Sequence, residues 1–149
     1  MQKKNIFAIC GSTKQASTNL MLLDYLAEKY AFQFNVQLYD GVEQLPHFNP
    51  DLDNETLPDA VVAFRKHIEE SDAVIICTPE YVFSLPGSLK NALDWTVSSV
   101  VFSDKPTALI TAAMSGEKAH ESLALIMKTI GAHFTTDTQI LIKGAKSKF

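Results

Sequence analysis

Short apolar runs alternate along the chain with longer segments of helical periodicity, and this alternation constrains the fold more than any other feature. Nearly uniform apolar runs predict strands buried on both faces at 5–10, 72–77 and 106–111, and a further strand at 137–142. Residues 34–39 alternate apolar and polar side chains, which predicts a half-buried edge strand. Helices are predicted at 19–30, 58–68, 86–96 and 117–130, the last ending at Gly131. A long surface loop is predicted at 41–57.

This order of elements predicts an α/β protein with a parallel sheet and helices on both faces. Crossovers between parallel strands are right-handed, and five strands favour the doubly wound order 2-1-3-4-5. No helix is predicted after residues 137–142, so the final helix is missing from the pattern. We therefore expect one face of the first and fifth strands to be uncovered, through shortening of the chain or through a partner that covers it.

Composition narrows the class of protein. The 149 residues suit one domain, 46% are apolar, and the net charge of −4 argues against a general binder of nucleic acid or of anionic membranes. No stretch resembles a signal peptide or has the length of a membrane span. Cys10 and Cys77 lack CxxC spacing, and we expect buried, reduced thiols in a cytoplasmic protein.

The first loop that bears on function is residues 11–19. In an open α/β sheet, ligands bind beyond the carboxyl ends of the strands where the strand order reverses, here between the first and third strands. The loop carries hydroxyl, amide and basic side chains on Ser12, Lys14, Ser17, Thr18 and Asn19. It leads into a predicted helix whose N–H groups and dipole favour an anion, so it suits a monophosphate. A turn with a simple N-cap stays an alternative.

The second loop at this point, residues 79–86, is aromatic and is bounded by two prolines. A planar ligand would pack against Tyr81 and Phe83. With a phosphate in the first loop, the ligand becomes a flat ring with a phosphorylated tail, and flavin mononucleotide (FMN) fits. Packing of these aromatics within the protein, or on a second subunit, stays an alternative.

Several sharper motifs are absent. Neither GxxxxGK[ST] nor GxGxxG occurs, which argues against a P-loop nucleotidase and a dinucleotide fingerprint. Cys10 opens the first loop as the nucleophile of a small tyrosine phosphatase would, but Ala16 stands where that family needs Arg. The four histidines show no metal-ligand spacing.

Both loops resemble the binding segments of the NADPH-dependent FMN reductase family. Residues 10–19, CGSTKQASTN, are similar to its GS-x-R-x-x-S-x-N loop. Residues 79–95 carry PEY, PG and LKNALDW, as in its PEYN-x-x-x-PG-x-LKNA-x-DW segment. The resemblance covers the whole chain. It implies a flavodoxin-like fold with residues 1–149 as a single FMN-binding domain.

The resemblance also implies site residues. Those implied for the FMN phosphate are Ser12, Lys14, Ser17, Thr18, Asn19 and the backbone N–H of Leu20. Those implied for the ring and ribityl chain are Pro79, Glu80, Tyr81, Val82 and Phe83, together with Met114 and Ser115 of the loop 112–117. Two residues depart from the family pattern: Lys14 replaces Arg, which removes bidentate phosphate contact, and Val82 replaces Asn. The family's Gly-rich loop after the fourth strand is also absent.

The implied function is that of an oxidoreductase. FMN would accept hydride from NADPH or NADH and pass electrons to a small acceptor, such as a quinone, azo compound, flavin or metal oxyanion, in a ping-pong cycle. Homodimers or homotetramers are implied, with FMN near the subunit interface. A flavodoxin-like electron carrier stays an alternative, although such carriers are usually strongly acidic and the net charge here is −4. A non-catalytic member of the fold is a third possibility.

Three further residues are weighed for roles near the site. His120, early in a predicted helix, could supply a proton, although a solvated or capping His is the commoner role. Trp95 and Phe102 are interpreted as part of a helix or subunit interface. The apolar stretch 95–102 accordingly predicts a dimer or larger assembly.

Overall fold

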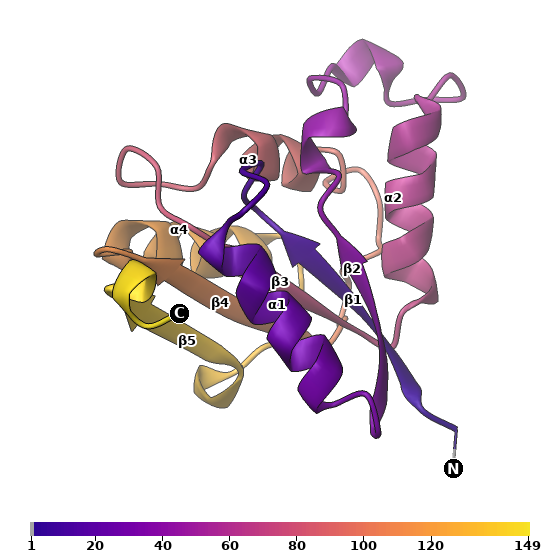
Figure 1. The fold of residues 1–149 in the computed structure, drawn as a ribbon. Helices are drawn as coiled ribbons and strands as arrows, with labels where there is room; N and C mark the ends of the chain where they lie inside the picture. Colours follow the sequence, from indigo (N-terminus) through magenta and orange to yellow (C-terminus); the bar gives the residue numbers. More distant parts are fainter. Residues whose placement is uncertain (1) are drawn as a thin grey trace.

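The strands form one parallel sheet in the order β2-β1-β3-β4-β5 in a computed structural model, which describes residues 2–149 (Figure 1). Their bounds are β1 Lys4–Cys10, β2 Phe34–Tyr39, β3 Ala73–Thr78, β4 Thr107–Ala113 and β5 Gln139–Lys143. The doubly wound, flavodoxin-like order expected from the sequence is thus confirmed. The main difference is the start of β5, because residues 136–138 form a 3-10 turn, η3, closed by a Thr135–Thr138 capping box.

The helices lie where the apolar periodicity predicts them. They are α1 Thr18–Lys29, α2 Asp59–Glu70, α3 Gly87–Asp94 and α4 Glu117–Thr129. Ser17 caps α1, and Gly131, with φ +87°, follows the end of α4 in the left-handed conformation that glycine favours there. The predicted loop between β2 and α2 contains two single 3-10 turns, η1 Val42–Gln44 and η2 Pro50–Leu52.

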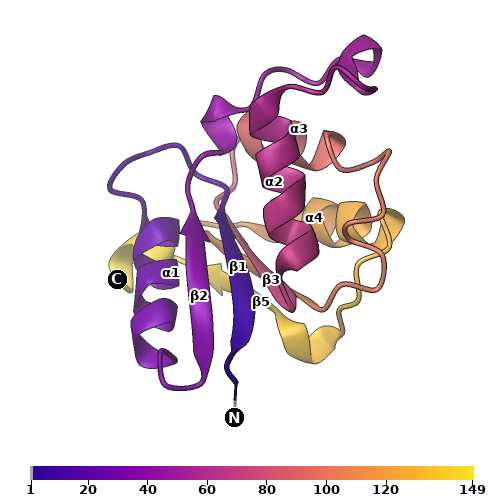
Figure 2. The same ribbon diagram turned by 90° about the vertical axis from the view of Figure 1, so that its right-hand side faces the viewer.

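The sheet separates two apolar layers of unequal size (Figure 2). Alternate residues of β1 and β3 point to opposite faces: Phe7 and Ile76 pack with α2, α3 and α4, whereas Cys10 and Cys77 pack with α1. The central strands are therefore buried on both sides, as their uniform apolar composition predicts.

The α1 face is incompletely covered. Within residues 2–149, β5 is followed by the single 3-10 turn η4, Ala145–Ser147, and α1 is the one helix packed on this face. A shallow apolar hollow of about 360 Å³ opens beside α1, lined by Val36, Ile75 and Ala108 among others. The hollow lies on the face from which a helix is missing, but among the described residues its lining includes Ile6 of β1 and none of β5.

Trp95 and Phe102 belong to the chain's own core, so of the two interfaces expected for them the subunit interface is wrong and packing within the chain is what the structure shows. Both side chains are buried, and the Trp95 ring donates to the carbonyl oxygen of Pro46 at 2.7 Å and packs edge-on against Phe48. The loop 41–57 folds back over the end of α3 and supplies these partners. Within the stretch 95–102, Val97 and Val100 are exposed.

Arg65 of α2 fixes this loop. Its guanidinium donates to the carbonyl oxygen of Trp95 at 2.7 Å, to Asp53 Oδ1 at 2.9 Å and to Ser98 Oγ at 3.0 Å. Hydrogen bonding from Ser98, together with Arg65, lowers the pKa of Asp53.

No helix in the described part of the chain is both long and apolar enough to cross a membrane.

Candidate functional site

A cavity of about 310 Å³ lies at the carboxyl ends of the strands, where the order reverses between β1 and β3. Four segments line it: the loops after β1, β3 and β4, and η4. Of the residues predicted for the site, it brings together Ser12, Lys14, Ser17, Thr18, Asn19, Pro79, Glu80, Tyr81, Met114 and Ser115. Leu20, Val82 and Phe83 lie outside the lining. Ala112 and Ala113 of the predicted loop 112–117 belong to it, and so do Ala145 and Lys146, which the sequence did not indicate.

The loop after β1 is shaped by its two buried serines. Ser17 Oγ accepts from the N–H of Leu20 at 3.0 Å, and Ser12 Oγ accepts from the N–H of Lys14 at 3.2 Å. The Leu20 N–H is therefore held by the N-cap. Each hydroxyl still carries a hydrogen that it can donate to an anion.

Asn19 connects three elements through its buried side chain. Its amide nitrogen donates to the carbonyl oxygen of Ala112 at 3.4 Å, and its amide oxygen accepts from Cys77 Sγ at 3.1 Å. These contacts fix the start of α1 over the ends of β3 and β4. The side chain of Asn19 is thus engaged in contacts within the protein. The group that Asn19 contributes to the exposed start of α1 is its backbone N–H.

The start of α1 is open to an anion. Ser17 accepts from the N–H groups of Leu20 and Met21. Within residues 2–149, the N–H groups of Thr18 and Asn19 meet no acceptor. Lys14 adds a positive charge to the cavity lining. Two free N–H groups, nearby hydroxyls and a lysine fit a phosphate at a helix N-terminus.

Gly11 brings the same loop close to β3 and α3. Its N–H donates to the carbonyl oxygen of Cys77 at 2.8 Å, and a Cβ at this position would lie 2.8 Å from Leu89 Cδ2. A side chain at residue 11 would therefore displace α3 or the loop. This close approach favours glycine at residue 11.

The aromatic loop after β3 ends in a strained turn. Tyr81 and Ser84 exchange backbone hydrogen bonds of 3.0 and 3.1 Å around two central residues, Val82 with φ 51° and Phe83 with φ 57°. Such a turn favours Asn-Gly, and a β-branched residue there is unusual. Tyr81, Val82 and Phe83 are 46%, 96% and 74% exposed, so this turn projects beside the cavity rather than into the core.

The loop after β4 supports both the cavity wall and the last segment of the chain. Gly116 has φ +89° and precedes α4, while the carbonyl oxygen of Met114 accepts from the N–H of Gly144 at 3.0 Å. That bond and the buried Ala145 fix η4 beside the start of α1, where Figures 1 and 2 both show it. Lys146 of η4 thereby becomes a second cation of the lining.

Glu80 lies between the loops after β3 and β4. Its backbone belongs to the loop after β3, and its carboxylate accepts from backbone N–H groups of Gly116, Lys118 and Ala119 at the start of α4. The two loops that flank the cavity are thus joined by one side chain.

The titratable groups near the cavity do not support catalysis by a thiolate. Burial raises the pKa of Cys10 and of Cys77, so both thiols stay protonated at neutral pH. His120 is hydrogen-bonded to Thr111 Oγ1 at 2.8 Å, and burial lowers its pKa. It lies outside the cavity lining, one turn into α4 and against β4.

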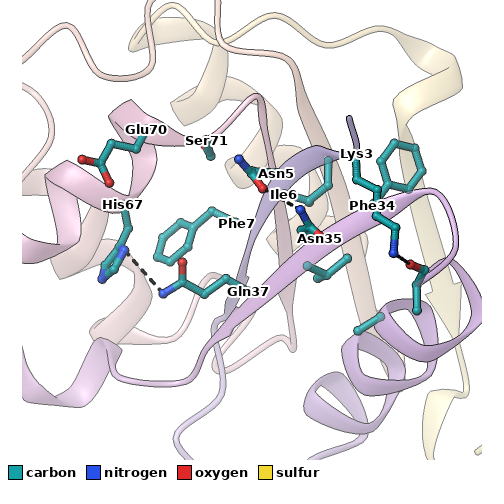
Figure 3. Close-up of a pocket in the computed structure, with 13 residues that line it drawn as sticks. Lys3, Asn5, Ile6, Phe7, Phe34, Asn35, Gln37, His67, Glu70 and Ser71 are labelled. Carbon is teal, nitrogen blue, oxygen red and sulfur yellow. Dashed lines mark hydrogen bonds between the residues drawn. The ribbon is translucent and has the colours of Figure 1, made fainter. Parts of the chain in front are cut away.

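A larger hollow of about 600 Å³ lies at the opposite end of the sheet, beside the amino ends of β1 and β2 (Figure 3). Its polar groups pair among themselves: Gln37 contacts His67 at 3.4 Å, and Asn35 donates to Asn5 at 3.1 Å. The His67 ring stacks on Phe7. Its cation, Lys3, donates to the carbonyl oxygen of Ala31 at 2.6 Å, and no helix of residues 2–149 begins in this hollow. The smaller cavity is therefore the candidate site.

Comparisons with known proteins match the chain to a family and to related enzymes. The model of the family described as NADPH-dependent FMN reductase matches residues 4–147. An NAD(P)H:quinone oxidoreductase of Solanum tuberosum is 34% identical over 92% of this chain and 74% of its own length. An NAD(P)H-dependent FMN reductase of Pseudomonas aeruginosa is 29% identical over 97% of this chain and 80% of its own.

A solved structure shares the fold. The flavoenzyme NAD(P)H:(acceptor) oxidoreductase FerB of Paracoccus denitrificans superposes with a TM-score of 0.78 at 28% identity, over 95% of this chain and 76% of that one. An azoreductase of Bacillus anthracis superposes with a TM-score of 0.75 at 16% identity, which shows the fold alone.

Proposed function

The chain belongs to the NADPH-dependent FMN reductase family, and from this premise we propose how its own residues hold FMN and admit its substrates. The observation that carries the proposal is the open start of α1 in the same cavity as the aromatic turn after β3. We propose that residues 1–149 act as one FMN-binding domain in an NAD(P)H-dependent oxidoreductase.

The phosphate is assigned to the start of α1. The N–H groups of Thr18 and Asn19 and the ammonium group of Lys14 bind its oxygens, and the hydroxyls of Ser12 and Ser17 donate their remaining hydrogens. This assignment is supported by the two N–H groups without an internal acceptor and by the dipole of α1. Lysine supplies charge without the bidentate geometry of the family's arginine.

The ring is assigned to the space between the loops after β3 and β4. Backbone atoms of Pro79 to Val82 and the loop at Met114 and Ser115 border it, and the exposed Tyr81 and Phe83 flank the approach of substrates. When bound, FMN supplies hydride acceptance from NAD(P)H and electron delivery to a second substrate in turn. The protein contributes binding and orientation, since the carboxylate of the described lining, that of Glu80, is already bonded to backbone N–H groups at the start of α4.

We propose a small planar acceptor, with quinones and azo compounds as the first classes to assay. Relatives named for these two classes include the quinone oxidoreductase of Solanum tuberosum and an NADPH azoreductase of a Bacillus species. Exposed apolar side chains at the mouth of the cavity, on Tyr81, Phe83 and Met114, suit such compounds.

The test is a visible spectrum of the protein reconstituted with FMN, followed by anaerobic NADPH or NADH. A reductase binds FMN stoichiometrically, is bleached by the nucleotide alone, and regains its colour with a quinone. Bleaching that requires an added reductase identifies an electron carrier instead. Absence of FMN binding identifies a non-catalytic member of the fold.

We further propose a homo-oligomer, dimer or tetramer, that forms across the mouth of the cavity. Support comes from the adjacent exposed side chains Tyr81, Val82, Phe83 and Met114. Sedimentation at micromolar protein checks this, and a monomer with and without FMN would contradict it.

A cytoplasmic location is proposed from the two free thiols, which an oxidising compartment would tend to pair or modify.

A further inference from the structure

The Glu80 side chain caps the start of α4, a role that the side chain of a helix's own N-cap residue normally has. Its Oε1 accepts from the N–H of Gly116 at 3.1 Å, and its Oε2 accepts from those of Lys118 at 3.1 Å and Ala119 at 3.0 Å. These are N–H groups that the first turn of α4 leaves without an intrahelical acceptor. A carboxylate from another loop therefore caps α4.

The fold leaves little room for a local cap. Gly116, the residue before α4, has φ +89°, and a Cβ there would lie 2.7 Å from Leu141 Cδ1 and 3.2 Å from Thr111 Cγ2. Ser, Thr or Asp at this position would be strained and would collide with β4 and β5. The cap is instead supplied from 36 residues earlier in the chain.

We propose that Glu80 is a positioning residue that holds the two walls of the ring site at a fixed separation. One wall is the loop 79–83, to which Glu80 belongs, and the other is the loop 113–116, to which its carboxylate is bonded. This inference rests on the proposed function, because the space between these walls is the space assigned to the ring. Preforming it lowers the cost of ordering the loops on binding.

The same contacts give the carboxylate an electrostatic role. Both of its oxygens accept N–H groups at the start of α4, where the helix dipole favours a carboxylate, so neither oxygen is directed at a substrate. The start of α4 is thereby capped, while within residues 2–149 the N–H groups of Thr18 and Asn19 in α1 stay free. The phosphate is directed to α1, and the ring is left between the joined loops.

Riboflavin, which has the ring without the phosphate, separates these contributions. Glu80→Ala weakens both riboflavin and FMN by about ten-fold, because a lost helix cap costs on the order of one factor of ten in an equilibrium. Glu80→Gln, which keeps one acceptor oxygen, weakens both by about three-fold. Lys14→Ala weakens FMN and leaves riboflavin unchanged. The matched control is Glu121→Gln, which removes an exposed carboxylate of α4 that pairs with Lys118.

The experiment titrates FMN and riboflavin into each apo-protein by flavin fluorescence, with amide hydrogen exchange at residues 116, 118 and 119. Faster exchange at these amides, with equal weakening of both flavins, supports the inference. Unchanged riboflavin affinity in a folded Glu80→Ala or Glu80→Gln protein overturns it and leaves a merely structural cap. Loss confined to FMN also overturns it. A wild-type protein that binds neither flavin overturns the proposed function and this inference together. If Glu80→Ala does not fold, Glu80→Gln provides the measurement.

Discussion

Replacing Val82 by Asn should stabilise the protein, although Val82 touches little of it. The residue sits at the first central position of the turn between Tyr81 and Ser84, with φ 51°. A side chain with a Cβ pays about 1–2 kcal/mol in the left-handed conformation, and Asn is among the residues that tolerate it best. The family pattern places Asn here.

The magnitude follows from the exposure of the side chain. Val82 is 96% exposed, so removing its methyl groups sacrifices almost no buried apolar area. The main effect of the substitution is therefore the relief of backbone strain, and we expect the free energy of unfolding to rise by about 1 kcal/mol. For a chain of 149 residues, whose unfolding entropy is about 0.3 kcal/mol/K, this raises Tm by about 3 °C.

The assay is thermal unfolding of the apo-protein by circular dichroism, supported by urea titration. The control is Val100→Asn, because Val100 is also exposed, at 80%, and is not among the residues with positive φ. The control should stay within about 0.5 kcal/mol of the wild type. A Val82→Asn protein that is no more stable than the wild type, or a control that gains as much, would refute the strain argument.

Three further predictions concern the phosphate site, the core and pH. Lys14→Ala should weaken FMN by about ten-fold, because an exposed lysine contributes at the low end of charge-assisted bonds, and equal FMN dissociation constants would remove Lys14 from the site. Arg65→Met should cost about 3 kcal/mol in urea unfolding, because it leaves the largely buried Asp53 without its ion-pair partner; a loss under 1 kcal/mol would contradict this. Burial lowers the pKa of His120, so as pH falls below about 6.5 the unfolded chain takes up a proton that the fold resists. Stability should therefore fall between pH 7.5 and 5 more steeply in the wild type than in His120→Gln, and parallel Tm profiles would be evidence against it.

Periodicity along the sequence predicted the fold and, through the fold, the end of the sheet at which the candidate site lies. Uniform apolar runs at 5–10 and 72–77 identified strands buried on both faces, and the structure confirms them as β1 and β3. Because the alternation of strands and helices fixes the direction of each crossover, it also fixed the end of the sheet at which the two loops meet. These are local signals, carried by residues within a few positions of each other.

Contacts between distant segments were decided by the tertiary structure alone. Trp95 looks like an interface residue in the sequence, but the path of the loop 41–57 buries it beneath Pro46 and Phe48. Lys146 lines the cavity only because Gly144 is bonded to Met114. The Glu80 carboxylate meets α4 across 36 residues. Such pairings depend on the path of the chain between distant segments, and the spacing of residues along the sequence does not specify that path.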